Sequence, residues 1–185
     1  LWIGGDIRTW GDLIGDASVS QPVHAYTRAD QCGAGEIWAQ FLGGQQESLQ
    51  GIGVHGESWM AGAVKKDPLG IGYTNLNFAY DSRSLQPISG IRVLPLDLNG
   101  NGRIDPDEDF YSTRTLVLEA VASESYPSPP SRNLYIVSNG IPRRDCVREF
   151  LLWALTRGQI HVPETGYIPL PKAVLEEGLR SLTDY

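Results

Sequence analysis

The sequence predicts an α/β fold, in which helices flank a mixed β-sheet. Two observations predict it. First, apolar residues recur at helical spacing in several segments, and short strand-like runs lie between those segments. Second, 41% of the 185 residues are hydrophobic and 20% are charged, which is typical of a globular protein and not of a disordered one. The chain is therefore long enough and apolar enough to bury one substantial core.

The first half of the chain alternates between strand-like and helical runs. Gly43-Gly44 ends one helical run, and Pro68 follows another. The elements that we expect, in order, are a helical turn at 9–13, a strand at 23–27, a helix at 36–42, a helix around the apolar residues of 59–64, and a strand at 71–74.

The second half continues this alternation on both sides of a proline cluster. Pro127, Pro129 and Pro130 form the best candidate boundary, because proline disfavours a helix in the residue before it. We therefore divide the chain into residues 1–128 and 129–185. The expected elements are a strand at 91–96, a helix at 115–121, a strand at 133–138, a helix with an apolar stripe over 147–155 that Gly158 closes, and a last helix over 174–182.

Composition and charge exclude several classes of function. The formal net charge of −7 argues against a nucleic-acid surface, which needs a basic stripe. The apolar run 150–155 is far shorter than the ~18 residues of a membrane span, so we expect none. The two cysteines, Cys32 and Cys146, form no CxxC motif, which removes the usual zinc and dithiol interpretations.

The turn at residues 28–35 is the strongest candidate for a binding site. It lies where the strand-like run 23–27 gives way to a helical run, and it contains Gly33, Ala34 and Gly35. The first N–H groups of a helix have no partner within that helix, and the helix dipole is positive at that end. An oxyanion can therefore bind there.

Charged side chains in the same turn strengthen this prediction. Arg28 would add a forked cationic donor, and Asp30 is placed to hold that guanidinium in one orientation. The same residues also fit a simpler interpretation, in which the glycines only form a strand-to-helix turn and Arg28 is a surface residue in a structural ion pair. The residues expected to bind an anion are Arg28, Asp30, Cys32, Gly33 and Ala34.

Residues 97–108 match the twelve-residue calcium loop at each diagnostic position. Gly102 supplies the sharp bend in the middle, and Glu108 can close the site with both carboxylate oxygens. Arg103 would contribute only its backbone carbonyl. The expected Ca²⁺ ligands are Asp97, Asn99, Asn101, Arg103, Asp105 and Glu108.

The run before this loop is strand-like and not helical, so the paired helices of a calcium sensor are absent from the pattern. We expect Ca²⁺ to stabilise the excursion between the strand at 91–96 and the helix at 115–121, without a signalling role. Free calcium is plentiful outside cells, which favours an extracytoplasmic location.

Several stretches, taken in order, resemble the PstS-type phosphate-binding proteins of ABC transporters, which belong to the periplasmic-binding-protein superfamily. Single stretches are short, but their shared order covers nearly the whole chain. They are residues 3–13 (IGGDIRTWGDL), 28–34 (RADQCGA), 70–73 (GIGY), 134–137 (LYIV), 149–153 (EFLLW), 158–159 (GQ) and 166–170 (GYIPL).

The resemblance implies a type II fold of two α/β lobes that close on a dehydrated oxyanion. On that basis residues 1–128 are the second lobe, and residues 129–185 are a crossover strand and helices that return to the first lobe, most of which is missing. In the family, a Ser-Gly-Thr segment donates hydroxyl and backbone hydrogen bonds. Cys32, Gly33 and Ala34 stand at those positions here, so two hydroxyl donors are lost.

We therefore expect a fragment that binds inorganic phosphate or a related tetrahedral oxyanion for an ABC importer, without turnover. The surface left by the missing lobe can also support a homo-oligomer. An alternative is a calcium-stabilised cell-surface interaction or sensing module without high oxyanion affinity. A hydrolase with Cys32 as its nucleophile is a third option, but the sequence places no histidine beside that thiol.

Overall fold

The structure is a computed structural model that describes residues 1–183, and it divides into two compact units. The first unit comprises Leu1–Arg132, and the second begins at Asn133. The division lies just after the proline cluster in which the sequence places the boundary. Each unit is described by itself below.

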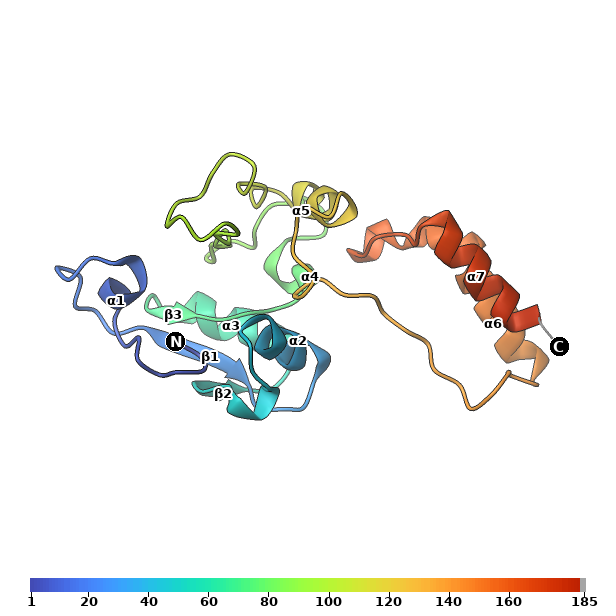
Figure 1. The fold of residues 1–185 in the computed structure, drawn as a ribbon, viewed down its shortest axis with the longest axis horizontal. Coiled ribbons are helices and arrows are strands. Elements are labelled where there is room, and N and C mark those ends of the chain that lie inside the picture. Colours follow the sequence, from blue (N-terminus) through green and yellow to red (C-terminus); the bar gives the residue numbers. More distant parts are fainter. Residues whose placement is uncertain (184–185) are drawn as a thin grey trace. The chain divides into compact units, whose positions relative to one another are not determined.

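A three-stranded sheet forms the centre of the first unit (Figure 1). Its strands are β1 (His24–Arg28), β2 (Ile52–Val54) and β3 (Gly70–Ile71), in the order β2-β1-β3. Both pairings are parallel, whereas a mixed sheet was expected. The α/β class itself is confirmed.

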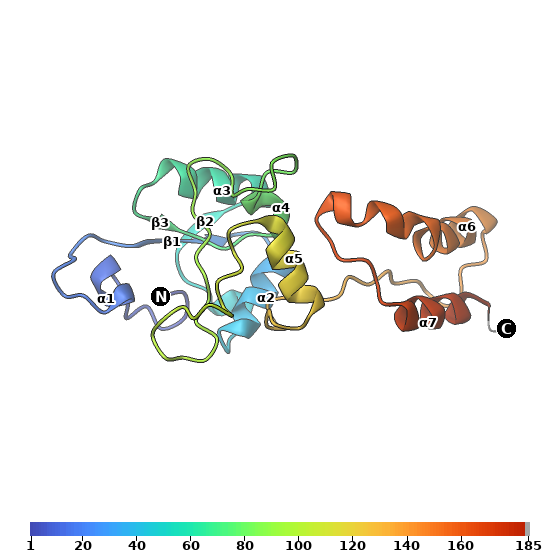
Figure 2. The same ribbon diagram turned by 90° about the horizontal axis from the view of Figure 1, so that it is seen from above.

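Helices cover both sides of these strands, and Figure 2 shows α3 on one side and α2 on the other. The longer helices begin and end where the apolar spacing predicts, although α2 starts three residues earlier than expected. The helices of this unit are α1 (Trp10–Ile14), α2 (Gly33–Phe41), α3 (Glu57–Lys66), α4 (Leu76–Ala79) and α5 (Arg114–Ala122), with a short 3₁₀ helix at Gln46–Ser48.

An aromatic cluster forms a separate core beside the sheet. Tyr80, Tyr111 and Val117 are buried at its centre, and Phe110 and Tyr126 pack against them. The Tyr80 hydroxyl donates to the carbonyl oxygen of Tyr111 at 2.7 Å. This cluster joins α4 and α5 to the irregular chain between them.

The strand expected at 91–96 does not form. Val93 and Leu96 pack against the aromatic cluster, but residues 91–96 pair with no neighbouring strand among the residues described. Their apolar side chains are thus explained by packing of irregular backbone. The prediction was wrong because an apolar run reports burial and not backbone pairing.

The strand expected at 133–138 is also absent. This segment is extended, but it has no strand partner within residues 1–183, and Tyr135 and Val137 are 81% and 89% exposed. Apolar residues so placed favour a strand only when another strand lies beside them.

The second unit is helical after this segment. It contains α6 (Asp145–Ala154) and α7 (Lys172–Thr183), with short 3₁₀ helices at Arg157–His161 and Pro163–Thr165 between them. The two predicted helices are confirmed. None of the helices within residues 1–183 combines the length and the apolar character that crossing a membrane requires.

Candidate functional site

Arg28 ends the central strand β1 and is held by both backbone and side chain. Its backbone N–H donates to the Tyr73 hydroxyl at 3.0 Å, and the same hydroxyl lies 3.0 Å from Oγ1 of Thr27. The Arg28 side chain is only 5% exposed. A cation this well buried needs partners, because an uncompensated charge in the interior is costly.

Two carboxylates provide those partners. Asp30 accepts from Nε of Arg28 at 2.9 Å and from a terminal nitrogen at 2.5 Å, and Glu57 accepts from the other terminal nitrogen. These bonds raise the pKa of Arg28, chiefly through Asp30, and hold the pKa of Asp30 well below its usual range. The guanidinium is therefore charged and fixed in one orientation, as the sequence predicts for Asp30.

Glu57 is the partner that sequence reasoning missed. It opens α3, and its second carboxylate oxygen accepts from Oγ1 of Thr74 at 2.7 Å and from the backbone N–H of Asn75 at 3.2 Å. It therefore connects the end of β1 to the segment after β3. Glu57 lies 29 residues from Arg28, and no local pattern links the two.

The N-terminus of α2 follows directly after this ion pair. Cys32 is the N-cap residue, and its sulfur accepts from the Gly35 N–H at 3.4 Å. The next two N–H groups, those of Gly33 and Ala34, have no hydrogen-bond partner among residues 1–183, as expected for the first turn of a helix. The thiol thus serves as a helix cap, and two backbone donors stay available for an anion.

Gln46 holds the turn between Asp30 and Cys32 in place. Its amide oxygen accepts from the Cys32 N–H at 3.1 Å, and its amide nitrogen donates to the Asp30 carbonyl at 2.7 Å. A β-carbon on Gly35 would lie 2.7 Å from the Gln46 side chain, so this close approach requires glycine there. The sequence shows the glycine, but it does not reveal the glutamine that needs it.

The residues predicted to hold Ca²⁺ gather into one loop. Asp97 accepts from the backbone N–H groups of Gly100, Asn101 and Gly102, and Asp105 accepts from the side-chain amides of Asn99 and Asn101. In the same loop, the backbone N–H of Arg103 donates to Oδ1 of Asn101.

Glu108 lies beneath this loop and is only 3% exposed. One of its oxygens accepts from the N–H groups of Leu98 and Asn99, and the other accepts from the N–H of Asp105. Within residues 1–183 no three His, Cys, Asp or Glu side chains are gathered as a metal ion would gather them. The calcium site stays a prediction, and the loop that would form it is already closed by protein hydrogen bonds.

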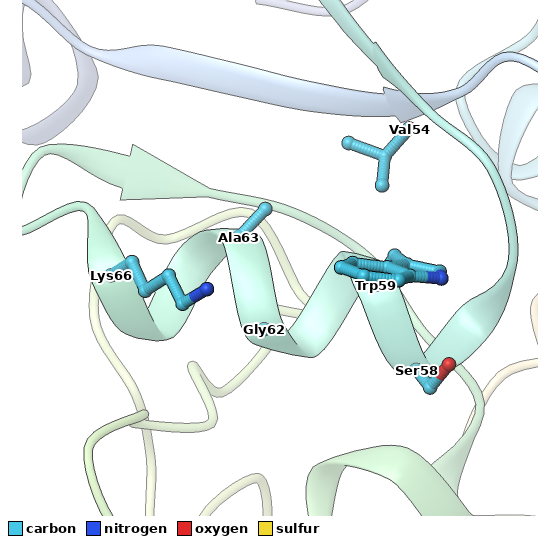
Figure 3. Close-up of a pocket in the computed structure, with 6 residues that line it drawn as sticks. All are labelled: Val54, Ser58, Trp59, Gly62, Ala63 and Lys66. Carbon is cyan, nitrogen blue, oxygen red and sulfur yellow. The ribbon is translucent and has the colours of Figure 1, made fainter.

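An open pocket of about 510 Å³ lies elsewhere on the first unit, between β2 and α3. Figure 3 shows Trp59, Ala63 and Lys66 on α3, with Val54 of β2 beside the Trp59 ring. Trp59 is 69% exposed. The pocket contains none of the residues predicted to bind an anion, and its wall is mostly apolar.

A protein-family model matches most of this chain. A family model described as a PBP superfamily domain matches residues 3–157. The phosphate-binding protein PstS of Methanocaldococcus jannaschii is 25% identical over an alignment of 154 residues, which covers 72% of this chain and 39% of PstS. The crystal structure of a possible phosphate binding protein from Planctomyces limnophilus is 16% identical with a TM-score of 0.48, covering 99% of this chain and 61% of that one. The chain thus spans less than two thirds of either protein.

Proposed function

Because the PBP superfamily domain accounts for residues 3–157, this chain belongs to that superfamily, and we propose that it forms the part of a solute-binding protein that holds phosphate or a similar tetrahedral oxyanion. The membership confirms the expected periplasmic-binding-protein superfamily and a fold like that of periplasmic binding proteins. Phosphate as the bound anion is supported by the similarity to PstS and by the chemistry of one turn.

The observation that carries the proposal is a pair of N–H groups, on Gly33 and Ala34, that have no partner within residues 1–183 and lie five and six residues after a buried arginine. Two neighbouring N–H groups at the positive end of a helix dipole can donate to the same oxyanion. Rigid donors of this kind bind with little reorganisation. Cys32 belongs to the proposed site as the cap that positions them, and its thiol is at most a weak donor.

The arginine keeps donors for a ligand despite its two carboxylate partners. A guanidinium has five N–H groups, and Asp30 and Glu57 accept from three of them. Two N–H groups are left by count, one on each terminal nitrogen. An oxyanion can therefore use Arg28 without displacing either carboxylate, which fixes the fork in place for it.

The wider biological role is part of the same proposal. We place the intact protein outside the cytoplasm, where it would deliver phosphate to the permease of an ABC importer, with binding and no turnover. The alternative of a calcium-stabilised interaction module receives less support from the comparisons. A hydrolytic Cys32 lacks support as well, since its sulfur caps α2, and Nδ1 of His24 lies 2.7 Å from Asp67 instead.

An NMR titration with inorganic phosphate tests this function on the ¹⁵N-labelled chain. We expect the amide signals of Gly33 and Ala34 to move with phosphate concentration, because these N–H groups would gain an anionic acceptor. Arg28→Lys keeps the charge but loses the fork, so it should weaken phosphate binding roughly tenfold or more.

The control amide is that of Gly62, which lies within α3 and away from the turn. Its signal should not respond to phosphate. If the Gly33 and Ala34 signals do not move at any phosphate concentration up to the solubility limit, the proposal is contradicted. Circular dichroism must show that Arg28→Lys still folds, since Asp30 and Glu57 depend on the cation.

We also propose that Ca²⁺ binds the loop at 97–108 as a structural ion. The loop is inserted between Leu96 and Phe110, and both of these residues pack against the aromatic cluster. An ion there would join the two ends of the excursion through Asp97 and Glu108. The ion would lower the mobility of the loop and leave the anion site unchanged.

A further inference from the structure

A second arginine lies against the N-terminus of α2. A β-carbon built on Gly33 would lie 2.3 Å from both terminal nitrogens of the Arg132 guanidinium. The guanidinium therefore fills the space in which any residue other than glycine would place its side chain. Arg132 ends the first unit, so this contact lies within one compact body.

Arg132 has no polar partner in the part of the chain that the structure describes. It is exposed, and within residues 1–183 it makes no ion pair and no side-chain hydrogen bond. A long cationic side chain held beside a helix N-terminus is unfavourable by itself, because the dipole is positive at that end. An anion at the same place would reverse the sign of that interaction.

The charges around the turn point the same way. Arg28 contributes +1, while Asp30 and Glu57 contribute −2, so these three residues have a formal net charge of −1. Such a group repels an anionic ligand on approach. Together with Arg132, these residues have a formal net charge of zero. Unlike Arg28, Arg132 has no carboxylate partner among the residues described.

We propose that Arg132 is a second anion-binding residue of this site, contacting the oxyanion from the side of Gly33. The inference rests on the proposed function and adds a residue to it. Gly33 then has two roles: its N–H donates to the oxyanion, and its missing side chain leaves room for the second guanidinium. Phosphate would be bound between a buried arginine with carboxylate partners and an exposed one without them in the part of the chain described.

Equilibrium dialysis with ³²P-labelled inorganic phosphate tests the inference on the whole chain. Arg132→Gln should raise the Kd for phosphate about tenfold, because one charge-assisted hydrogen bond is lost. Arg92→Gln is the matched control, since Arg92 is also exposed and the change in net charge is the same. The difference between the two variants should shrink as salt is added, because exposed charges are screened.

Gly33→Ala provides an independent variant that keeps Arg132. The new methyl group would take the space of the guanidinium, and the exposed, flexible arginine can swing away without disturbing the core. We expect a loss of affinity similar to that of Arg132→Gln. The double variant should bind no worse than either single one, because both substitutions remove the same contact.

The outcomes separate this inference from the proposed function. If wild-type chain binds phosphate and Arg28→Lys weakens it, while Arg132→Gln binds as tightly as Arg92→Gln, then Arg132 is not a ligand and the proposed function stands. Additive losses in the double variant would also overturn the contact through Gly33. If the wild-type chain binds no phosphate, both the proposed function and this inference are wrong.

Discussion

At the scale of single residues, the hydroxyl of Tyr80 is the clearest case of a buried polar group with one partner. The side chain is 1% exposed, and its hydroxyl donates to the Tyr111 carbonyl. Tyr80→Phe would leave that carbonyl without its donor inside the core. We expect a loss of about 1–2 kcal/mol in the free energy of unfolding, measured by urea denaturation at neutral pH.

Tyr80 also makes the free energy of unfolding depend on pH. Burial raises the pKa of Tyr80 to about 12, and it also raises the pKa of Tyr126 in the same cluster. In the unfolded chain these phenols ionise near pH 10. Their contribution to stability is thus fully present below pH 10 and is lost as the pH rises toward 12, because only the unfolded state releases the protons.

Tyr80→Phe should therefore be less sensitive to alkali than the wild-type chain between pH 10 and 12. Tyr135→Phe is the matched control, because Tyr135 is 81% exposed. That variant should follow the wild-type profile at every pH. If the stability of Tyr80→Phe falls with alkali as steeply as that of the wild-type chain, then the Tyr80 phenol ionises equally easily in the folded and unfolded wild-type chain.

Sequence reasoning at this scale succeeded where partners are close in the chain. Asp30 holds Arg28 as predicted, because it follows Arg28 by only two positions at the end of a strand. Glu57, Gln46 and Arg132 were missed, since each reaches the turn from a different segment. Only the folding of those segments onto β1 and α2 brings the three side chains together.

At the scale of elements, the calcium loop offers a direct test. If Ca²⁺ binds, excess ion should raise the melting temperature by several degrees relative to excess chelator, since ligand at about 100 times its Kd stabilises by about 2.7 kcal/mol. Asp97→Asn should remove most of this rise by deleting a charged ligand. Differential scanning calorimetry measures both.

Asp107→Asn is the matched control for that experiment. Asp107 lies in the same acidic loop and is exposed, but it is not at a ligand position of the twelve-residue pattern. It should keep the calcium-dependent rise. Equal melting temperatures for the wild-type chain in calcium and in chelator would refute a structural ion here.

Elements with a strong period were predicted well, and short extended ones were not. The apolar stripes on α3, α5, α6 and α7 identify helices because each stripe needs a partner surface. The strand β2 was missed, since Ile52–Val54 is only three residues long and two of them are exposed. Residues 91–96 and 133–138 have the composition of strands, but composition cannot supply the neighbouring strand that pairs with them.

At the scale of the whole molecule, the sheet has unpaired outer edges. Both β2 and β3 pair only with β1 in the part of the chain that the structure describes. Open edges can pair with another chain, so the predicted homo-oligomer would form there. The oligomer stays a prediction, and both strands are short, which limits what each edge can offer to a partner.

The exposed residues at the start of the second unit, 133–138, should be the first site of proteolysis. Leu134 and Tyr135 are 61% and 81% exposed, and residues 133–138 have no strand partner within residues 1–183. A protease needs several residues of accessible backbone, and all of residues 133–138 are exposed. Limited digestion with chymotrypsin, followed by mass spectrometry, should give a first cut after Leu134 or Tyr135. The released first unit keeps β1, α2 and the aromatic cluster, so its far-ultraviolet circular dichroism and melting should match those of a folded domain. First cuts within residues 24–122 would instead mean that the first unit opens more easily than the segment after it.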